Sequence, residues 1–186
     1  MAVVAVPFSV FCADGQIKIG QTSSTTFPIT ISSSGSYVLT SNLNVSSTSA
    51  NAITIDADNV TIDLNGHAII GPGEEIGTGS GIYANNSTIT NCTVRANHED
   101  GIYAQYATII TNCTAYENTG DGIQGGQRTC IECNNLKNNG EYGLTLVSSN
   151  NYAIKNTASN NTSGQFNNGG SNNHMPISGD NANWNP

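Results

Sequence analysis

A repeat with a period of about 21 residues constrains this chain more than any other feature of its sequence. Four short segments begin with Gly followed by Ile or Leu, and they stand 20, 21 and 21 residues apart: Gly81–Ala84, Gly101–Ala104, Gly122–Gly125 and Gly143–Leu146. A period of this length means that each repeat is one small unit that cannot bury its apolar face alone. We therefore expect successive repeats to stack on one another.

The residues inside each repeat favour short β-strands over a leucine-rich repeat. Leu is scarce between Gly81 and Thr162, where a leucine-rich repeat would need several in each unit. β-Branched residues instead alternate with polar ones, as in Ile53-Thr54-Ile55, which is typical of a strand with one buried face. Asn, Gly, Asp and Ser fill the intervening runs and suit turns. The chain is predicted to be all-β, a parallel β-helix of roughly six coils with capped ends.

Aligning the repeats on their glycines predicts which side chains form columns. Residues seven before each glycine and one after it are apolar, so two inward columns are expected: Val94, Ala115 and Leu136, and Ile82, Ile102, Ile123 and Leu144. Four residues before the glycines stand Asn97, Asn118 and Asn139. These predict an internal asparagine ladder, in which each amide bonds to the next coil about 4.8 Å away.

Two stretches near the beginning of the chain carry a family resemblance. The segments 29–40 and 58–67, followed by the Gly-Ile repeats and the closing Trp184-Asn185, resemble bacterial right-handed parallel β-helix repeat proteins of the pectin-lyase-like superfamily. The resemblance covers most of residues 15–186 and implies right-handed coils. It implies no single activity, because the superfamily includes lyases, hydrolases, epimerases and phage spikes.

Three regions are expected along the chain. They are an N-terminal segment and cap over 1–28, the β-helix over 29–162 and a C-terminal tail or cap over 163–186, anchored by Trp184. The apolar run from Ala2 to Phe11 has two interpretations, the tail of a signal peptide cleaved near Ala13 or a cap over the open first coil. The cap is favoured, because no Lys or Arg precedes the run and an exposed solenoid end must be covered.

The charge balance excludes some classes of partner. Among 186 residues, five are basic and thirteen acidic, which gives a net charge of −8. Nucleic acids and anionic membranes both require cationic surfaces, so neither is an expected partner. Low charge with abundant Asn, Ser, Thr and Gly is typical of secreted solenoids. We therefore expect a secreted or extracellular location, the bacterial cell envelope included.

The cysteines leave three interpretations open. Cys92, Cys113 and Cys133 fall at nearly the same place on successive coils, and Cys130 stands three residues before Cys133. An inert stack of small buried side chains is favoured, because free Cys is among the most buried residue types. A disulfide between adjacent coils is the second interpretation. A thiolate metal site is the third, although zinc would need a second such pair or spaced histidines.

Two aspartates are candidates for a metal site or an acid/base pair. Asp100 and Asp121 each precede a repeat glycine, so they should stack about 5 Å apart on neighbouring coils. Carboxylates at that distance need a cation or a hydrogen-bond donor between them, and calcium is the ion that such a pair would hold. Alternatively, each Asp starts its turn by bonding local backbone. Tyr142 occupies the third position of the column and favours the turn role, so no cofactor is expected.

The densest group of titratable side chains is a candidate catalytic site. It comprises Arg95, His98, Glu99 and Asp100. In proton abstraction beside a uronate carboxyl, the reaction of lyases and epimerases, Arg95 would neutralise the carboxylate and His98 or Glu99 would act as the base. The next coil supplies no second row of such groups, which favours a non-enzymatic role.

Aromatic side chains give the preferred functional hypothesis. Tyr83 and Tyr103 each follow an inward Ile, so they should point outward, one above the other, with Gln105 and Gln124 nearby. Such rings suit stacking against sugars, although pairing of two Tyr across strands would also stabilise the sheet. We expect a secreted, non-catalytic β-helix that binds carbohydrate or a protein partner through its side face, self-association included. The alternative is a small polysaccharide lyase or epimerase acting on uronate polymers.

Overall fold

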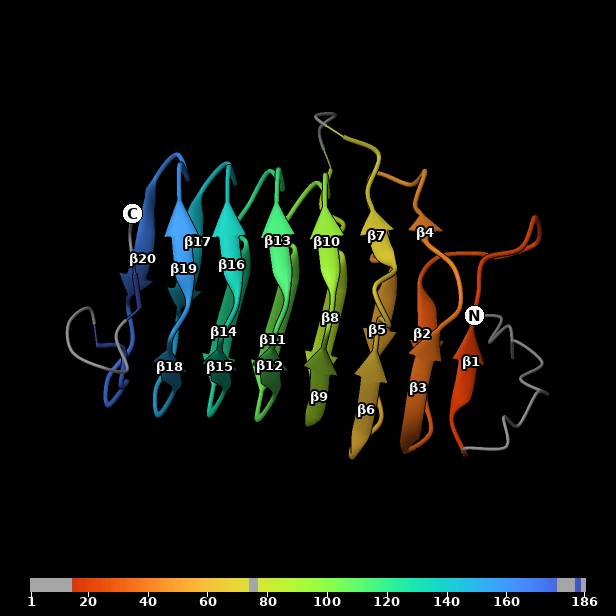
Figure 1. Cartoon of the computed structure of the whole chain (residues 1–186), viewed down its shortest axis with the longest axis horizontal. Coiled ribbons are helices and arrows are strands. Elements are labelled where there is room, and N and C mark those ends of the chain that lie inside the picture. The colour runs from red at the N-terminus through yellow and green to blue at the C-terminus, as the bar shows by residue number, and fades with distance from the viewer. Residues whose placement is uncertain (1–14, 74–76, 177–182, 185–186) are drawn as a thin grey trace.

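The chain forms a solenoid of short parallel strands arranged as three sheets along one axis (Figure 1). The computed structural model describes residues 15–73, 77–176 and 183–184, and these contain no helix. Each complete coil contributes one strand to each sheet, in the order sheet B, sheet A, sheet C. The predicted all-β parallel β-helix is therefore confirmed.

The strands of the three sheets are as follows. Sheet A holds β1 (Ile17–Ile19), β3 (Gly35–Leu39), β6 (Val60–Asp63), β9 (Ser87–Thr90), β12 (Ile109–Thr111), β15 (Cys130–Glu132) and β18 (Tyr152–Ile154). Sheet B holds β2 (Ile29–Ile31), β5 (Ile53–Ile55), β8 (Ile82–Asn85), β11 (Ile102–Tyr106), β14 (Ile123–Gln127), β17 (Tyr142–Leu146) and β20 (Gly164–Asn168). Sheet C holds β4 (Leu43–Asn44), β7 (Ala68–Ile70), β10 (Thr93–Arg95), β13 (Thr114–Tyr116), β16 (Asn135–Lys137) and β19 (Thr157–Ser159).

The stack is longer than the sequence pattern predicted. Sheets of seven, seven and six strands make about seven coils, where roughly six were expected. The reason is that β1 and β20 lie outside the predicted range 29–162, in segments that were assigned to the caps. Both segments lack the Gly-Ile signature, so the repeat alone did not reveal them.

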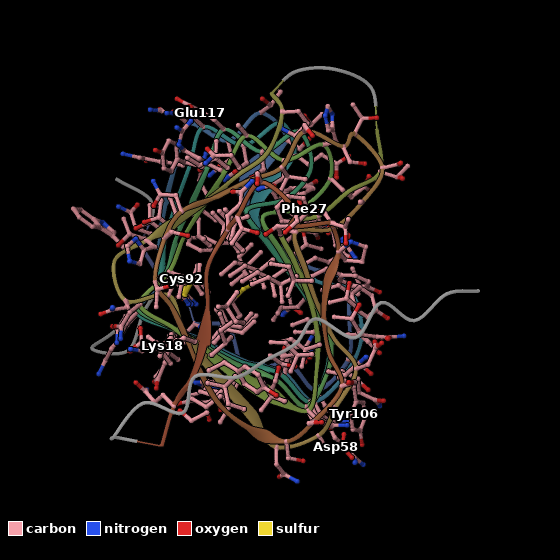
Figure 2. The ribbon with its side chains drawn as sticks, turned by 90° about the vertical axis from the view of Figure 1, so that its right-hand side faces the viewer. Lys18, Phe27, Asp58, Cys92, Tyr106 and Glu117 are labelled. Atoms are coloured by element: carbon pink, nitrogen blue, oxygen red, sulfur yellow. A yellow bond between two sulfur atoms is a disulfide. The ribbon has the colours of Figure 1, made fainter. Side chains whose placement is uncertain are left out.

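Both predicted inward columns are confirmed. Val94 pairs with Ala115 and Ala115 with Leu136 in sheet C, and all three side chains are fully buried. Ile82, Ile102, Ile123 and Leu144 pair in the same way in sheet B and are also fully buried. Seen along the stack, the side chains fill the space inside the coils (Figure 2). One continuous apolar core therefore runs the length of the solenoid.

The corners of the solenoid share one local rule. At most corners a residue with left-handed backbone is followed directly by a buried residue, as in Glu117-Asn118 and Asn138-Asn139, whereas Asn65 is followed by the exposed Gly66. The left-handed position turns the chain sharply, and Asn tolerates it better than most residues. The buried polar residue then bonds backbone groups that the turn would leave unpaired. The Asn-rich runs of the sequence are these corners.

The predicted asparagine ladder is confirmed at the corner between sheets C and B. Asn97 Nδ2 donates to Asn118 Oδ1 over 2.8 Å, and Asn118 Nδ2 donates to Asn139 Oδ1 over 3.0 Å. The ladder continues to Asn161 and ends on the side chain of Gln165. Each Oδ1 of the inner members also accepts the backbone N–H of the preceding ladder residue. Buried backbone at this corner is thereby satisfied from coil to coil.

Two further ladders occupy the other corners. Between sheets A and C, Asn134 donates to Asn156 and Asn156 to Asn183. Between sheets B and A, Asn151 Oδ1 accepts from the hydroxyl and backbone N–H of Thr129, and Asn173 Oδ1 accepts from the backbone N–H of Asn151. All three corners therefore carry polar ladders through the later coils.

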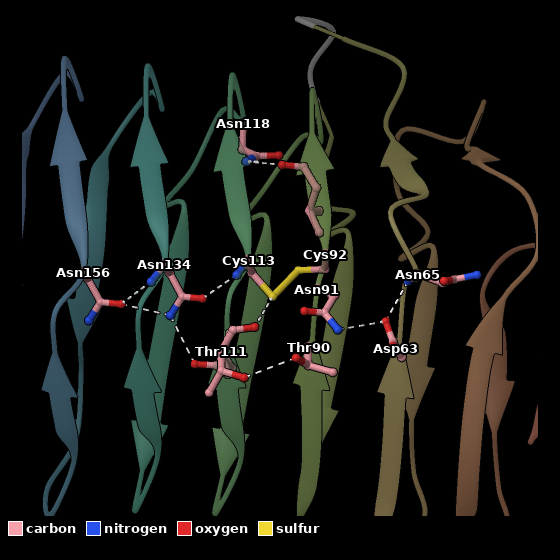
Figure 3. The surroundings of a disulfide bond; sticks show 12 residues. Asp63, Asn65, Thr90, Asn91, Cys92, Thr111, Cys113, Asn118, Asn134 and Asn156 are labelled. Atoms are coloured by element: carbon pink, nitrogen blue, oxygen red, sulfur yellow. Dashed lines mark hydrogen bonds between the residues drawn. A yellow bond between two sulfur atoms is a disulfide. The ribbon is translucent and has the colours of Figure 1, made fainter.

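The favoured interpretation of Cys92, Cys113 and Cys133 as an inert buried stack is wrong, and the second interpretation, a disulfide between adjacent coils, describes one pair of them. Cys92 and Cys113 form a disulfide between adjacent coils, in line with the Asn134–Asn156 ladder (Figure 3). Cys133 is an exposed free thiol at the left-handed corner position, with φ of 58°. Asn134 takes the inward place instead, and its Oδ1 accepts the backbone N–H of Cys113. Cys130 is also a free thiol, on β15.

The C-terminal segment covers part of the last coil, but not through the expected anchor. The Trp184 side chain is 64% exposed, whereas Asn183 is 2% exposed and its amide donates to the carbonyl of Ala153. The backbone of Trp184 still bonds to Asn156 and Ala158 along the edge of the stack. The apolar run Ala2–Phe11 and the proposed cleavage point at Ala13 lie outside the described residues.

Candidate functional site

The two predicted tyrosines lie together on the outer surface of sheet B. Tyr83 on β8 and Tyr103 on β11 are register partners, and both side chains are half-buried. Their ring centroids are 5.3 Å apart, with an angle of 72° between the ring planes. The rings therefore meet edge to face, a favourable aromatic geometry, instead of forming the two flat parallel surfaces that simple stacking suggests.

Gln105 reaches the tyrosine pair because β11 contains a bulge. The register between β8 and β11 shifts between Ala104 and Tyr106, which leaves Gln105 as the extra residue. Its Oε1 accepts a hydrogen bond from the Tyr83 hydroxyl and another, of 3.3 Å, from Asn85 Nδ2. The exposed amide of Gln105 is thereby held against the edge of the tyrosine pair.

The next strand adjusts to this bulge with a glycine. Gly126 on β14 lies opposite Gln105, the extra residue of the bulge on β11. A Cβ at Gly126 would lie 2.1 Å from the Gln105 carbonyl oxygen. No residue with a side chain fits without moving the backbone of β11. Glycine at position 126 is thus required by the shape of the site.

Gln124 joins the tyrosines to the corner of the solenoid. It is the register partner of Tyr103 on β14, and its Nε2 donates to Asp100 Oδ2 over 3.2 Å. We call the surface formed by Tyr83, Asn85, Tyr103, Gln105 and Gln124 the tyrosine–amide face. All four predicted carbohydrate-binding residues, Tyr83, Tyr103, Gln105 and Gln124, lie on it.

Sequence reasoning missed two residues at the far edge of this face. Arg128 donates from Nη1 to the Tyr106 hydroxyl, and its Cζ lies 5.6 Å from the centre of the Tyr106 ring. Tyr106 is on the outside of the coils (Figure 2). The spacing of 22 residues between them is one more than the usual step of the repeat and places them on neighbouring coils, so it could have identified the pair.

Asp100 and Asp121 use their carboxylates to hold turns together. Asp100 Oδ1 accepts the backbone N–H of Asp121 over 2.8 Å, and Asp121 Oδ1 accepts that of Tyr142 over 2.8 Å. Both side chains are buried. This arrangement matches the turn role, with the bond made to the next coil instead of the local one. Among the described residues, no three His, Cys, Asp or Glu side chains gather where they could hold a metal ion.

Burial changes how these carboxyls titrate. Loss of hydration raises the pKa of Asp100 to about 8, although the Asp121 N–H that it accepts opposes the rise. Burial also raises the pKa of Asp121. The pKa of the Tyr103 phenol is raised too, by burial first and then by the neighbouring Tyr83 and Asp100. Asp100 is therefore largely protonated at neutral pH.

The predicted catalytic group is not assembled into one site. The Arg95 guanidinium lies on sheet C over the Tyr116 ring, 6.0 Å from its centre. His98 is only 3% exposed, and neither ring nitrogen has a hydrogen-bond partner. It lies against the loop at Gly77, where a Cβ would be 2.9 Å from its Cγ. Glu99 is exposed at the corner. The cation, the imidazole and the carboxylates therefore do not face a common space.

A known protein family matches this chain. The family described as "right handed beta helix region" matches residues 29–182, whereas neither the curated proteins nor the solved structures gave a significant match. Among the described residues, no helix has the length and apolar character to cross a membrane. The family match spans most of the chain and agrees with the parallel solenoid described above, which is consistent with the pectin-lyase-like superfamily. This chain belongs to the right-handed β-helix family.

Proposed function

We propose that this chain is a secreted, non-catalytic protein that binds carbohydrate through the tyrosine–amide face. The observation that carries the proposal is the convergence of two outward phenol rings with three side-chain amides on adjacent coils. Aromatic rings offer apolar surface to the C–H groups of a sugar, and amides donate to and accept from its hydroxyls. The face combines both kinds of contact.

Secretion is supported by the disulfide and by the composition. Cys92 and Cys113 are bonded across adjacent coils. Disulfides persist in oxidising compartments and are rare in the cytosol. Only 10% of the residues are charged, which suits an extracellular solenoid better than a cytosolic globule.

Absence of catalysis is supported by how the candidate groups diverge. Acid–base catalysis needs its groups within hydrogen-bond reach of one substrate. His98 is buried inside the corner, and Arg95 lies over Tyr116 on another sheet. Asp100 and Asp121 already accept backbone N–H groups. Backbone N–H groups already donate to both carboxyl groups, which supports a role without calcium.

A glycan array followed by calorimetry tests the proposal. Wild-type protein should bind at least one oligosaccharide, and Tyr103→Ala should weaken that binding about fivefold, because each aromatic contact contributes on the order of 1 kcal/mol. Tyr116→Ala is the matched control, since Tyr116 is also half-buried and outward but lies on sheet C. Equal losses in both variants, or no bound glycan at all, would remove the proposal.

A protein partner is the second candidate, and the outer surface of sheet A favours a second copy of this chain. Ile109 and Tyr152 are 44% and 40% exposed, and both pair with Cys130 in one outward column. An apolar column on a regular sheet suits a self-complementary contact. Sedimentation analysis should show a dimer that Ile109→Asp dissociates. A monomer at all concentrations excludes this candidate.

A further inference from the structure

We infer that the tyrosine–amide face selects uncharged glycans and excludes polymers of uronic acids. This inference rests on the proposed function, because it names the class of carbohydrate that the same face takes. It is carried by the charges that border the face and by the positions of the few cations in the chain.

The groups offered to a ligand by this face are uncharged. Tyr83 and Tyr103 present phenols, while Asn85, Gln105 and Gln124 present amides. A polyuronate carries one carboxylate on each sugar, and burying such a charge against a protein needs a cation or several donors. Amides and phenols suit the hydroxyls of a neutral sugar and supply no compensating charge.

The cations of the chain are placed elsewhere or already engaged. The sequence has only five Lys and Arg residues. Arg95 and Lys137 lie on sheet C on either side of Tyr116, and Lys18 is on β1 of sheet A. Lys155 is at the corner between sheets A and C. Arg128 alone borders the face, and its guanidinium is held by Tyr106 at the edge away from Asp100.

Acidic groups border the opposite edge of the face. Asp100 Oδ2 accepts from Gln124, and the charges of Asp121, Glu99 and Glu141 are close enough to Asp100 to raise its pKa further. Glu99 and Glu141 are exposed at this corner two coils apart, with Gly120 at the same place on the coil between them. A polyuronate lying across Tyr83, Tyr103 and Gln124 would bring its carboxylates beside them. Like charges at such a contact suppress binding, most strongly at low ionic strength.

Matched polymers that differ only in charge test the inference. The probes are neutral oligosaccharides with cellulose, xylan and mannan backbones, and the cellulose and mannan oligosaccharides with their C6 hydroxyls oxidised to carboxylates. Calorimetry at low and high salt should show binding of a neutral glycan and at least tenfold weaker binding of its carboxylated form. The difference should shrink at high salt, because salt screens the repulsion.

Charge-neutralising variants show whether charge repulsion or poor steric fit weakens binding of the carboxylated glycan. The double variant Glu99→Gln/Glu141→Gln should strengthen binding of the carboxylated glycan several-fold and leave the neutral glycan unchanged. Glu132→Gln on sheet A is the control and should change neither. Equal or tighter binding of the carboxylated form overturns this inference and leaves the proposed function standing. Binding of no glycan overturns both.

Discussion

Asn and Asp solve the same corner problem with different consequences. Asn118 and Asp121 are both buried at the corner between sheets C and B, and each has an oxygen that accepts a backbone N–H of a neighbouring coil. The Asn amide also donates, so the ladder repeats without charge. A carboxylate cannot donate unless it holds a proton, and burial favours the protonated form. Burial of a carboxyl at this corner therefore raises the pKa of Asp100 to about 8.

The first prediction concerns this buried carboxyl. Its pKa is raised from 3.8 to about 8 on folding, so the folded state binds more protons across that range. The free energy of unfolding should therefore fall as pH rises from 4 towards 8. The full stabilisation from this carboxyl is present only at a pH below its pKa in the unfolded chain. Asp100→Asn keeps an oxygen for the Asp121 N–H, with Gln124 turning its carbonyl to the new amide. Between about pH 5 and pH 8, the free energy of unfolding of the variant should fall by on the order of 1–3 kcal/mol less than that of wild type.

Urea denaturation at the two pH values measures this difference. Asp56→Asn is the control, because Asp56 is exposed at a corner. Its pH dependence should match that of wild type. Parallel pH profiles for wild type and Asp100→Asn would contradict the prediction. Some dependence should survive in the variant, because burial raises the pKa of Asp121 as well.

At the scale of the strand and corner, the ladders connect coils that are individually too small to fold. Asn118 Oδ1 accepts from both the amide and the backbone N–H of Asn97, and its own amide donates to Asn139. One side chain thus satisfies groups on two neighbouring coils. Loss of that side chain would leave several buried polar groups unpaired.

The second prediction follows from this arrangement. Asn118→Ala should lower the free energy of unfolding by about 2–4 kcal/mol, since each orphaned buried group costs about 1–3 kcal/mol. Asn135→Ala is the matched control, because Asn135 is exposed on β16 in the next coil. It should change stability by less than about 0.5 kcal/mol. Comparable effects in the two variants, measured by chemical denaturation, would exclude the ladder as a main source of stability.

Sequence reasoning succeeded where the period was regular and failed where the spacing changed. Columns such as Asn97, Asn118 and Asn139 repeat every 21 residues, so alignment on glycine located them. The ladder that runs from Asn134 to Asn156, a step of 22 residues, and from Asn156 to Asn183, a step of 27 residues, was missed. Cys133 was misplaced because the count from glycine could not show which corner residue takes the left-handed backbone.

The candidate face was predictable in its members and not in its geometry. Alternation of inward and outward residues placed Tyr83 and Tyr103 on the surface. The angle between their rings depends on side-chain packing, which the period does not specify. The position of Gln105 depends on a bulge, and a bulge changes register without leaving a repeat signature. The hydrogen bond from Gln124 to Asp100 connects the predicted carbohydrate-binding residues to the predicted pair of aspartates, which the sequence analysis treated as two separate sites.

The third prediction concerns the covalent link between coils. Cys92 and Cys113 are 21 residues apart, and closing a loop of that length restricts the unfolded chain by about 3 kcal/mol. Reduction should therefore lower Tm by roughly 6–12 °C for a chain of this size. The double variant Cys92→Ser/Cys113→Ser should melt at the same temperature with and without reductant. A wild-type Tm that reductant does not change, or peptide mapping that finds both thiols free, would contradict the prediction.

For the whole molecule, regular coiling separates chemistry by face. Sheet B carries phenols and amides, sheet C carries Arg95, Tyr116 and Lys137 in one column, and sheet A carries the exposed Ile109 and Tyr152. Residues close in sequence but on different sheets point in different directions. Arg95 and Asp100 are five residues apart, yet one lies over Tyr116 and the other contacts Gln124. Proximity in sequence therefore gives a poor guide to a shared site in this fold.

The last prediction tests this separation against the alternative enzymatic role. A lyase or epimerase acting on uronates needs a cation beside the substrate carboxylate and a base facing the adjacent proton. The structure places Arg95 on sheet C, buries His98 and gives both aspartates backbone partners. Incubation with polyuronates should therefore yield no unsaturated product by ultraviolet absorbance and no change of sugar configuration by proton NMR, with or without calcium. Product that forms with wild type, disappears in His98→Ala and persists in Lys137→Ala would show that these groups meet in solution, and the binding proposal would then give way to catalysis.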